Sequence, residues 1–165
     1  GEIEDAARGA TVLFVCTGNT CRSPMAEALF KKRLARKLEV EVEQLEGLGY
    51  RILSAGTSAF GGSCASEESV DVMKERGCDI GSHQSSPLSL EILEEADRIY
   101  ALTSSHKLGI AALAASCELS AEEMERKLRL VAERDISDPI GLDINGYRSC
   151  ADEIDAGLEE IMRGF

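Results

Sequence analysis

Thr11–Val15 (TVLFV) is the feature of the sequence that most constrains the fold, because all five residues are apolar or β-branched. Such a run has no polar face, which is typical of a central strand in a parallel sheet that helices cover on both sides. Cys16 follows the run directly, and a short polar loop with a glycine separates it from a helix-like segment. The segment therefore predicts a buried strand that ends at a loop and leads into a helix.

The rest of the chain alternates between strand-like and helix-like segments. Further strands are predicted at Tyr50–Ser54, Asp97–Leu102 and Arg129–Ala132. Helices are predicted at Pro24 to about Leu45, Ser66–Arg76, Ser89–Glu95, Ser105–Ser116, Ala121–Lys127 and Asn145 to about Arg163. This alternation predicts an α/β fold: a four-stranded parallel sheet flanked by helices on both faces. Ligands of such sheets bind beyond the carboxyl ends of the strands, where the loop after the first strand lies.

The totals are those of a single globular domain. The chain has 165 residues, of which 44% are hydrophobic, and this suits one domain with a real core. We expect residues 11–165 to form that domain, residues 1–10 to be a flexible N-terminal extension, and the protein to be a monomer.

Charge and hydropathy argue against several classes of partner. The formal net charge is −12, so we expect no nucleic acid partner, since phosphate backbones need a basic face. No apolar run approaches the roughly 18–20 residues of a membrane span, so we expect no membrane insertion. The first ten residues lack the features of a signal or transit peptide, and the six cysteines lack zinc-like spacing, which predicts reduced thiols. We therefore expect a cytoplasmic protein, or one of an organelle stroma if the N-terminus is processed.

Cys16 and Arg22 stand at the two ends of the loop that follows the first strand. Between them lie Gly18 and Asn19, residue types that tolerate positive φ, so the loop can fold back and form a nest of N–H groups for an anion. The helix that opens at Ser23-Pro24 adds its positive end. These groups would stabilise a thiolate at Cys16, and the planar fork of Arg22 matches two oxygens of a phosphoryl group. The loop therefore predicts a sulfur nucleophile that attacks phosphorus.

Two further side chains complete the predicted chemistry. Ser23 could donate a hydrogen bond to the sulfur, or it could simply cap the helix. Phosphoryl transfer also needs a proton donor for the leaving group. The candidate is Asp138, which Pro139 places in a rigid loop after the fourth strand, and Asp135 is the competing carboxylate. An Asp-Pro pair alone is usually a turn.

The string VCTGNTCRSPMAEALF, followed by SAG at 54–56, SHQS at 82–85 and DP at 138–139, resembles the low-molecular-weight protein tyrosine phosphatase family. The resemblance spans nearly the whole of residues 11–165 and implies a phosphatase domain with a phosphate-binding loop after the first strand. It also implies a two-step mechanism through a phosphocysteine, without a metal or other cofactor, acting on phosphorylated protein substrates. Carried over by position, Cys16 is the nucleophile, Arg22 binds phosphate, and Asp138 is general acid and then general base.

The resemblance assigns supporting roles as well. Asn19 would hold the loop in its strained shape, with Ser54 and His83 as hydrogen-bonding supports. The other members of the phosphate-binding loop would be Thr17, Gly18, Thr20, Cys21 and Ser23. Cys21 matches a family position for which the resemblance implies a reversible disulfide with Cys16 that protects the nucleophile from over-oxidation; the alternative is a small buried residue. His106 carries no signal.

Thr20 separates the two phosphatase interpretations. Most tyrosine-directed members carry a bulky aliphatic residue here, whereas the protein arginine phosphatase branch has threonine in the same string. A hydroxyl beside the phosphate can accept a hydrogen bond from the guanidinium N–H of phosphoarginine, which a larger aliphatic group would crowd. Alternatively, Thr20 is only a neutral β-branched substitute.

The residues after the Asp-Pro pair point the same way. Ile140, Gly141 and Leu142 stand where tyrosine-directed members usually carry aromatic residues that sandwich the phenol ring. Phe60 and Tyr147 are the aromatic residues that could still reach the pocket. Two further alternatives are an arsenate reductase, which would need a cysteine relay such as Cys64 with Cys78, and a phosphoprotein-binding module without catalysis.

Overall fold

The computed structural model describes residues 9–117 and 119–165. In this part of the chain four strands form one sheet: β1 (Thr11–Cys16), β2 (Arg51–Gly56), β3 (Arg98–Ala101) and β4 (Leu128–Leu130). All neighbours are parallel, in the order β2-β1-β3-β4. The predicted four-stranded parallel sheet is therefore confirmed. Residues 1–8, most of the expected N-terminal extension, lie outside the described residues.

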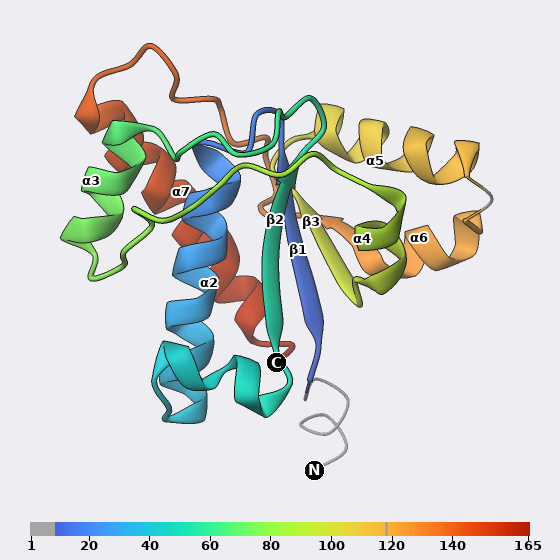
Figure 1. Cartoon of the computed structure of the whole chain (residues 1–165), viewed down its shortest axis with the longest axis horizontal. Helices are drawn as coiled ribbons and strands as arrows, with labels where there is room; N and C mark the ends of the chain where they lie inside the picture. Colours follow the sequence, from blue (N-terminus) through green and yellow to red (C-terminus); the bar gives the residue numbers. More distant parts are fainter. Residues whose placement is uncertain (1–8, 118) are drawn as a thin grey trace.

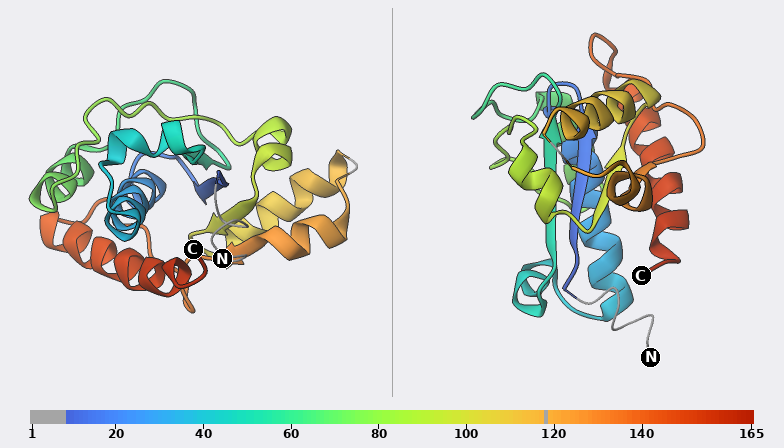
Figure 2. Two further views of the ribbon diagram at one scale, coloured as in Figure 1. Left: turned by 90° about the horizontal axis from the view of Figure 1, so that it is seen from below. Right: turned by 90° about the vertical axis from the view of Figure 1, so that its right-hand side faces the viewer.

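Helices cover both faces of the sheet, as predicted (Figures 1 and 2). The helices on one side are α2 (Arg22–Leu38), α3 (Glu67–Glu75) and α7 (Ile144–Met162). Those on the other side are α4 (Leu90–Glu95), α5 (Ser104–Ser116) and α6 (Ala121–Lys127). Most of these boundaries agree with the predicted ones within one or two residues.

β1 lies inside the sheet and contributes to two separate hydrophobic cores. Val12, Phe14 and Cys16 face the core that α2 and α7 close, while Leu13 and Val15 face the core that α5 and α6 close. All six residues of the strand are buried. Burial on both faces is the physical reason for the unbroken apolar run, because a polar side chain on either side would lose its water without a partner.

The long helix predicted from Pro24 to about Leu45 is wrong in its second half. α2 ends at Leu38, and Glu39 adopts the left-handed conformation with φ 57°. Two short 3-10 turns follow, Val42–Gln44 and Glu46–Leu48. The last turn of α2 already faces water, since Leu38 is 37% exposed, whereas Leu45 is only 3% exposed. Because the chain turns away from the helix after Leu38, Leu45 can be buried. The acidic residues of this segment gave no indication of that turn.

Two strands are also displaced from their predicted positions. β2 continues to Gly56 instead of ending at Ser54, and β4 covers Leu128–Leu130 rather than Arg129–Ala132. In both cases pairing with the neighbouring strand decides the ends: Gly56 pairs with Cys16, and Leu128 pairs with Ile99.

The carboxyl ends of the four strands meet at the upper edge of the sheet in Figure 1, where several loops are bonded to one another. The amide of Leu102, after β3, donates to Val15 O at 3.0 Å, and that of Ile136, after β4, donates to Leu102 O at 3.0 Å. On the other side, Thr57 N donates to Cys16 O at 2.9 Å. Segments far apart in sequence therefore surround the loop that follows β1. Within the described part of the chain, no helix has the length and apolar character needed to cross a bilayer.

Candidate active site

The loop between β1 and α2 folds around the sulfur of Cys16. Cys16 ends β1 and is only 3% exposed, and Arg22 begins α2. Midway between them, Asn19 has φ 56°, a conformation that asparagine tolerates better than most residues. This turn brings the Asn19 backbone N–H to 3.3 Å from Cys16 Sγ. The loop thus turns a backbone donor inward toward the sulfur, as expected of an anion nest.

The side chain of Asn19 ties the loop to the rest of the site. Its Nδ2 donates to Ser23 Oγ at 2.8 Å and to Ser54 Oγ at 2.9 Å, and its Oδ1 accepts from Ser86 N at 2.8 Å. His83 Nε2 lies 2.8 Å from the Asn19 carbonyl oxygen, so this ring nitrogen is the donor. Asn19 is completely buried, and these hydrogen bonds stabilise its left-handed backbone conformation. The predicted supports Ser54 and His83 therefore both contact the predicted loop residue.

Ser23 is placed to act on the sulfur rather than on the helix end. Its Oγ lies 2.8 Å from Cys16 Sγ. Because that oxygen already accepts a hydrogen bond from Asn19 Nδ2, its own proton can point at the sulfur. Ser23 is the second residue of α2, and Cys21 takes the N-cap position. Of the two roles considered for Ser23, the geometry favours the hydrogen bond to sulfur.

Gly56 is a residue of the site whose role was not predicted from the sequence. A Cβ built on it would lie 2.4 Å from Thr17 O and 3.0 Å from Asn19 N. The loop therefore passes directly over the end of β2, and only a residue without a side chain allows that approach. The available signal was a glycine at the end of a strand, within the SAG string.

Arg22 and Asp138 come together from distant parts of the chain. Arg22 is 5% exposed, and its Nη1 donates to Ile136 O at 2.8 Å. Its Nη2 lies 3.6 Å from Asp138 Oδ2, in an ion pair whose carboxylate side chain is 43% exposed. The other oxygen, Asp138 Oδ1, accepts from Ile140 N at 3.1 Å. A partly exposed carboxylate thus sits beside the buried guanidinium.

Asp135, the competing carboxylate, is bonded to the start of α5. Its Oδ1 accepts hydrogen bonds from both the backbone N and the Oγ of Ser104, each at 2.8 Å. These bonds hold the pKa of Asp135 below its usual value. Asp135 therefore anchors the first turn of α5, and the geometry favours Asp138 as the proton donor.

Thr20 and Cys21 form the part of the loop that faces α3 and α7. Thr20 is half-buried, and its carbonyl oxygen accepts from Ser66 N at 2.9 Å. Cys21 Sγ lies 3.4 Å from Ser66 Oγ and 3.6 Å from Tyr147 Oη. Both Cys16 and Cys21 are free thiols here, so the disulfide between them stays a prediction. Tyr147 is 2% exposed and touches Cys21; burial raises its pKa to about 12.

Three exposed apolar side chains lie on the loops at the same edge of the sheet. Phe60 is 85% exposed, Ile140 is 68% exposed and Leu142 is 55% exposed. Phe60 follows β2, and the other two follow Asp138. Contact of such side chains with another molecule is favourable, because it removes apolar surface from water.

His106 also belongs to this region, although nothing in the sequence pointed to it. It lies in the first turn of α5, and its Nε2 is 2.7 Å from Thr17 Oγ1. A lone histidine in a helical segment offered no pattern from which this contact could be read.

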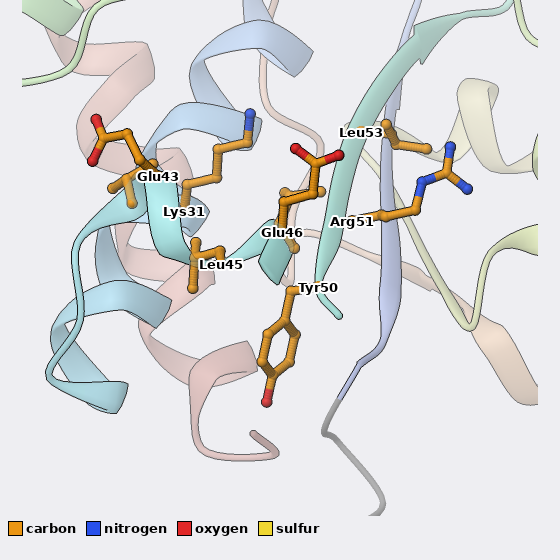
Figure 3. A pocket seen from close by; sticks show the side chains of 9 residues that line it. Lys31, Glu43, Leu45, Glu46, Tyr50, Arg51 and Leu53 are labelled. Carbon is orange, nitrogen blue, oxygen red and sulfur yellow. The ribbon is translucent and has the colours of Figure 1, made fainter. Parts of the chain in front are cut away.

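A separate hollow lies near the start of β2, beside α2 and the two 3-10 turns (Figure 3). It encloses about 450 Å³ and is lined by residues that include Lys31, Leu45 and Arg51. Its cations are already paired, Lys31 with Glu27 at 2.9 Å and Arg51 with Glu95 at 3.1 Å. The described residues that line it include neither cysteine nor histidine, and β2 runs from this hollow toward the loop at its other end. The hollow is therefore not part of the site.

Both the sequence and the fold are similar to those of known phosphatases. The family model described as low molecular weight phosphotyrosine protein phosphatase matches residues 11–164. A protein-arginine-phosphatase of Bacillus subtilis (strain 168) is 36% identical over 152 residues, which cover 92% of this chain and 91% of that protein. A protein-arginine-phosphatase of Geobacillus stearothermophilus is 37% identical over 155 residues, covering 91% and 92%.

A solved structure of similar fold is also that of a phosphatase. The crystal structure of a low molecular weight protein tyrosine phosphatase from T. tengcongensis is 33% identical, with a TM-score of 0.76. The match covers 94% of this chain and 99% of that one.

Proposed function

The chain belongs to the low molecular weight phosphotyrosine protein phosphatase family and is a cysteine-dependent protein phosphatase; from this premise we propose that it hydrolyses phosphoarginine on proteins. The observation that carries the choice of substrate is Thr20 in the phosphate-binding loop. The names of the two similar protein-arginine-phosphatases support the same choice.

In the proposed first step, the thiolate of Cys16 attacks phosphorus, and the bond between phosphorus and the substrate nitrogen breaks as the S–P bond forms. Protonated Asp138 gives its proton to the leaving nitrogen. The Asn19 N–H, 3.3 Å from the sulfur, and the guanidinium of Arg22 hold the negative charge that spreads over the phosphoryl oxygens. The 3.6 Å approach of Asp138 to Arg22 supports this assignment, since it places the acid beside the phosphate clamp.

In the proposed second step, water attacks the phosphocysteine. The carboxylate of Asp138 takes a proton from that water, and the electron pair of the S–P bond returns to sulfur. The hydroxyl of Ser23, 2.8 Å from Cys16 Sγ, stabilises the departing thiolate by a hydrogen bond. Inorganic phosphate leaves, and the enzyme regains its starting protonation.

Thr20 supports phosphoarginine as the substrate through both its hydroxyl and its size. A Cβ built on Gly18 would lie 3.7 Å from Thr20 Oγ1, so the hydroxyl lies beside the backbone of the loop. There it can accept an N–H of the substrate guanidinium, and a longer aliphatic side chain would fill the same space. Ile140 beyond the Asp-Pro pair, in place of an aromatic residue, also disfavours a clamp for a phenol ring.

Three substitutions at one position test this proposal. Thr20→Val keeps the volume and removes the hydroxyl, and Thr20→Ser keeps the hydroxyl. Thr20→Ile removes the hydroxyl and makes the side chain one carbon longer than that of valine. We expect Thr20→Val to lose roughly tenfold to a hundredfold in kcat/KM on a phosphoarginine protein, because a hydrogen bond to a charged group is lost. Thr20→Ser should retain most activity, and Thr20→Ile should shift the ratio of rates toward phosphotyrosine. A Thr20→Val variant with wild-type kinetics on phosphoarginine would show that the hydroxyl of Thr20 does not contribute to substrate preference.

Phosphotyrosine is the second candidate substrate, and Phe60 is the observation that favours it. An aromatic ring that is 85% exposed on a loop at the edge of the site could stack on a phenol ring. The similar tyrosine phosphatase from T. tengcongensis gives the same indication. The wild-type preference between the two phosphorylated side chains decides between these candidates.

Two other functional hypotheses have less support. Arsenate reduction would need a cysteine relay, but Cys64 is exposed and burial raises the pKa of Cys78, which makes it a poor nucleophile. Thiol-dependent arsenate reduction by the purified protein would restore that reading. A non-catalytic binding module would need neither Cys16 nor Asp138, and it predicts that the wild type releases no more phosphate than Cys16→Ser does.

A further inference from the structure

His106 is a buried histidine to which the two-step mechanism gives no role. It lies in the first turn of α5, where its backbone N donates to the capping hydroxyl of Thr103 at 3.2 Å. β3, which leads into α5, pairs with β1, which leads into the phosphate-binding loop, so the start of α5 lies beside that loop (Figure 1). His106 is only 5% exposed.

The imidazole of His106 makes one hydrogen bond, to Thr17 in the phosphate-binding loop. Its Nε2 lies 2.7 Å from Thr17 Oγ1. Its Nδ1 is buried and finds no hydrogen-bond partner among the described residues. A neutral imidazole carries one N–H and one acceptor nitrogen, and a buried N–H without a partner is rarer than a buried acceptor without one. The contact therefore favours the tautomer in which Nε2–H donates to the threonine oxygen.

This donation has a consequence for the hydroxyl of Thr17. When Oγ1 accepts from the ring, its own proton must point away from His106. Thr17 directly follows Cys16, its side chain is exposed, and its carbonyl oxygen accepts from Ser58 N at 3.0 Å. Backbone and side chain are thus both held, and the O–H remains able to donate to another acceptor.

Burial and the balance of nearby charges keep His106 neutral. Burial lowers its pKa to about 4, and the positive charge of Arg22 on α2 acts in the same direction. Asp135 and Asp138, on the loop after β4, act in the opposite direction but do not outweigh them. The ring therefore carries a single N–H at neutral pH, in keeping with a single partner.

We propose that His106 is a positioning residue of the phosphate-binding loop, whose neutral imidazole donates Nε2–H to Thr17 and thereby directs the Thr17 hydroxyl at an oxygen of the bound phosphoryl group. It acts through Thr17 and does not touch the reacting atoms. The inference rests on the proposed phosphatase chemistry of this loop, but not on the choice between arginine and tyrosine substrates.

The test is a double-mutant cycle with a small aryl phosphate as the probe, which measures the loop independently of side-chain preference. His106→Leu removes the donor, whereas His106→Gln can place an amide nitrogen where Nε2 lies. Thr17→Val removes the hydroxyl that His106 is proposed to position. We expect His106→Leu to lose about threefold to tenfold in kcat/KM, the effect of one neutral hydrogen bond, and His106→Gln to recover most of it. In the Thr17→Val background, His106→Leu should cause no further loss. An equal loss in both backgrounds would overturn the proposal, because it would show that His106 acts only through the packing of α5.

A measurement on the wild-type protein keeps the proposal falsifiable if a variant fails to fold. The chain has two histidines, so nitrogen-15 NMR can assign their rings by comparison with His106→Gln. We expect the His106 ring to carry its proton on Nε2 at neutral pH and to remain neutral down to about pH 5. A proton on Nδ1 in the folded enzyme would contradict the proposed direction of the hydrogen bond. Failure to hydrolyse phosphoarginine, with activity on the aryl phosphate retained, would refute the proposed substrate and leave this inference standing.

Discussion

Asp138 and Asp135 are three positions apart, and at the scale of single residues they have different bonding partners. Asp138 stays partly exposed beside Arg22, while Asp135 is bound twice by Ser104. The sequence contained both carboxylates, and the Asp-Pro pair indicated Asp138 only through its resemblance to a family motif. Which carboxylate would lie beside Arg22 could not be predicted, because it depends on where β4 ends relative to α5.

Replacing Asp138 tests whether this carboxylate, and not Asp135, is the proton donor. We expect Asp138→Asn to lower kcat by about 10²–10⁴ on a substrate whose leaving group needs a proton. The loss should be much smaller on an aryl phosphate whose leaving phenol is already acidic. The measurement is kcat across a series of leaving groups. Asp135→Asn is the matched control, since it should keep the wild-type dependence on the leaving group; if it instead behaves like Asp138→Asn, the assignment of the acid is wrong.

At the scale of elements, the phosphate-binding loop depends on the strand beside it. β1, the loop and the start of α2 were all predictable, since an unbroken apolar run, a glycine with an asparagine and a Ser-Pro pair follow one another in the sequence. The packing of that loop over Gly56 was not predictable from those letters, because it depends on the register of β2 against β1. The end of α2 was missed for a similar reason, since burial of Leu45 outweighs a pattern compatible with a longer helix.

Gly56→Ala tests the contact between β2 and the loop. The added methyl would have to displace Thr17 O or Ala59, whose Cβ would lie 2.7 Å away. We expect a loss of about 1–3 kcal/mol in the free energy of unfolding, together with a marked fall in kcat/KM. Gly61→Ala, in the following loop, is the control, because a Cβ there meets nothing within 4 Å. Denaturant unfolding and steady-state kinetics measure both effects, and equal behaviour of the two variants would contradict the close approach.

At the scale of the whole molecule, the buried neutral His106 couples the stability of the fold to pH. Its pKa is lowered to about 4 in the folded protein, against about 6.5 in an unfolded chain. Below pH 6.5 the unfolded state therefore binds a proton that the folded state does not, and stability is lost as the pH falls toward 4. At about 1.36 kcal/mol for each pKa unit, the loss is at most about 3 kcal/mol.

His106→Gln isolates this contribution, because glutamine does not titrate. We expect the free energy of unfolding of the wild type to fall more steeply than that of the variant between pH 7 and pH 4.5. The many carboxylates of this chain, with its net charge of −12, titrate in both proteins and cancel in the comparison. Parallel curves from denaturant titrations would mean that His106 is not held neutral by the fold.

The central claim, that this cysteine phosphatase acts on phosphoarginine, is tested most directly by one comparison of rates. The same substrate protein, phosphorylated either on a single arginine or on a single tyrosine, is given to the wild-type enzyme, with Cys16→Ala as the blank. We predict a higher kcat/KM on phosphoarginine, and no turnover of either substrate by the blank. A wild-type enzyme that hydrolyses phosphotyrosine and leaves phosphoarginine intact would contradict the claim.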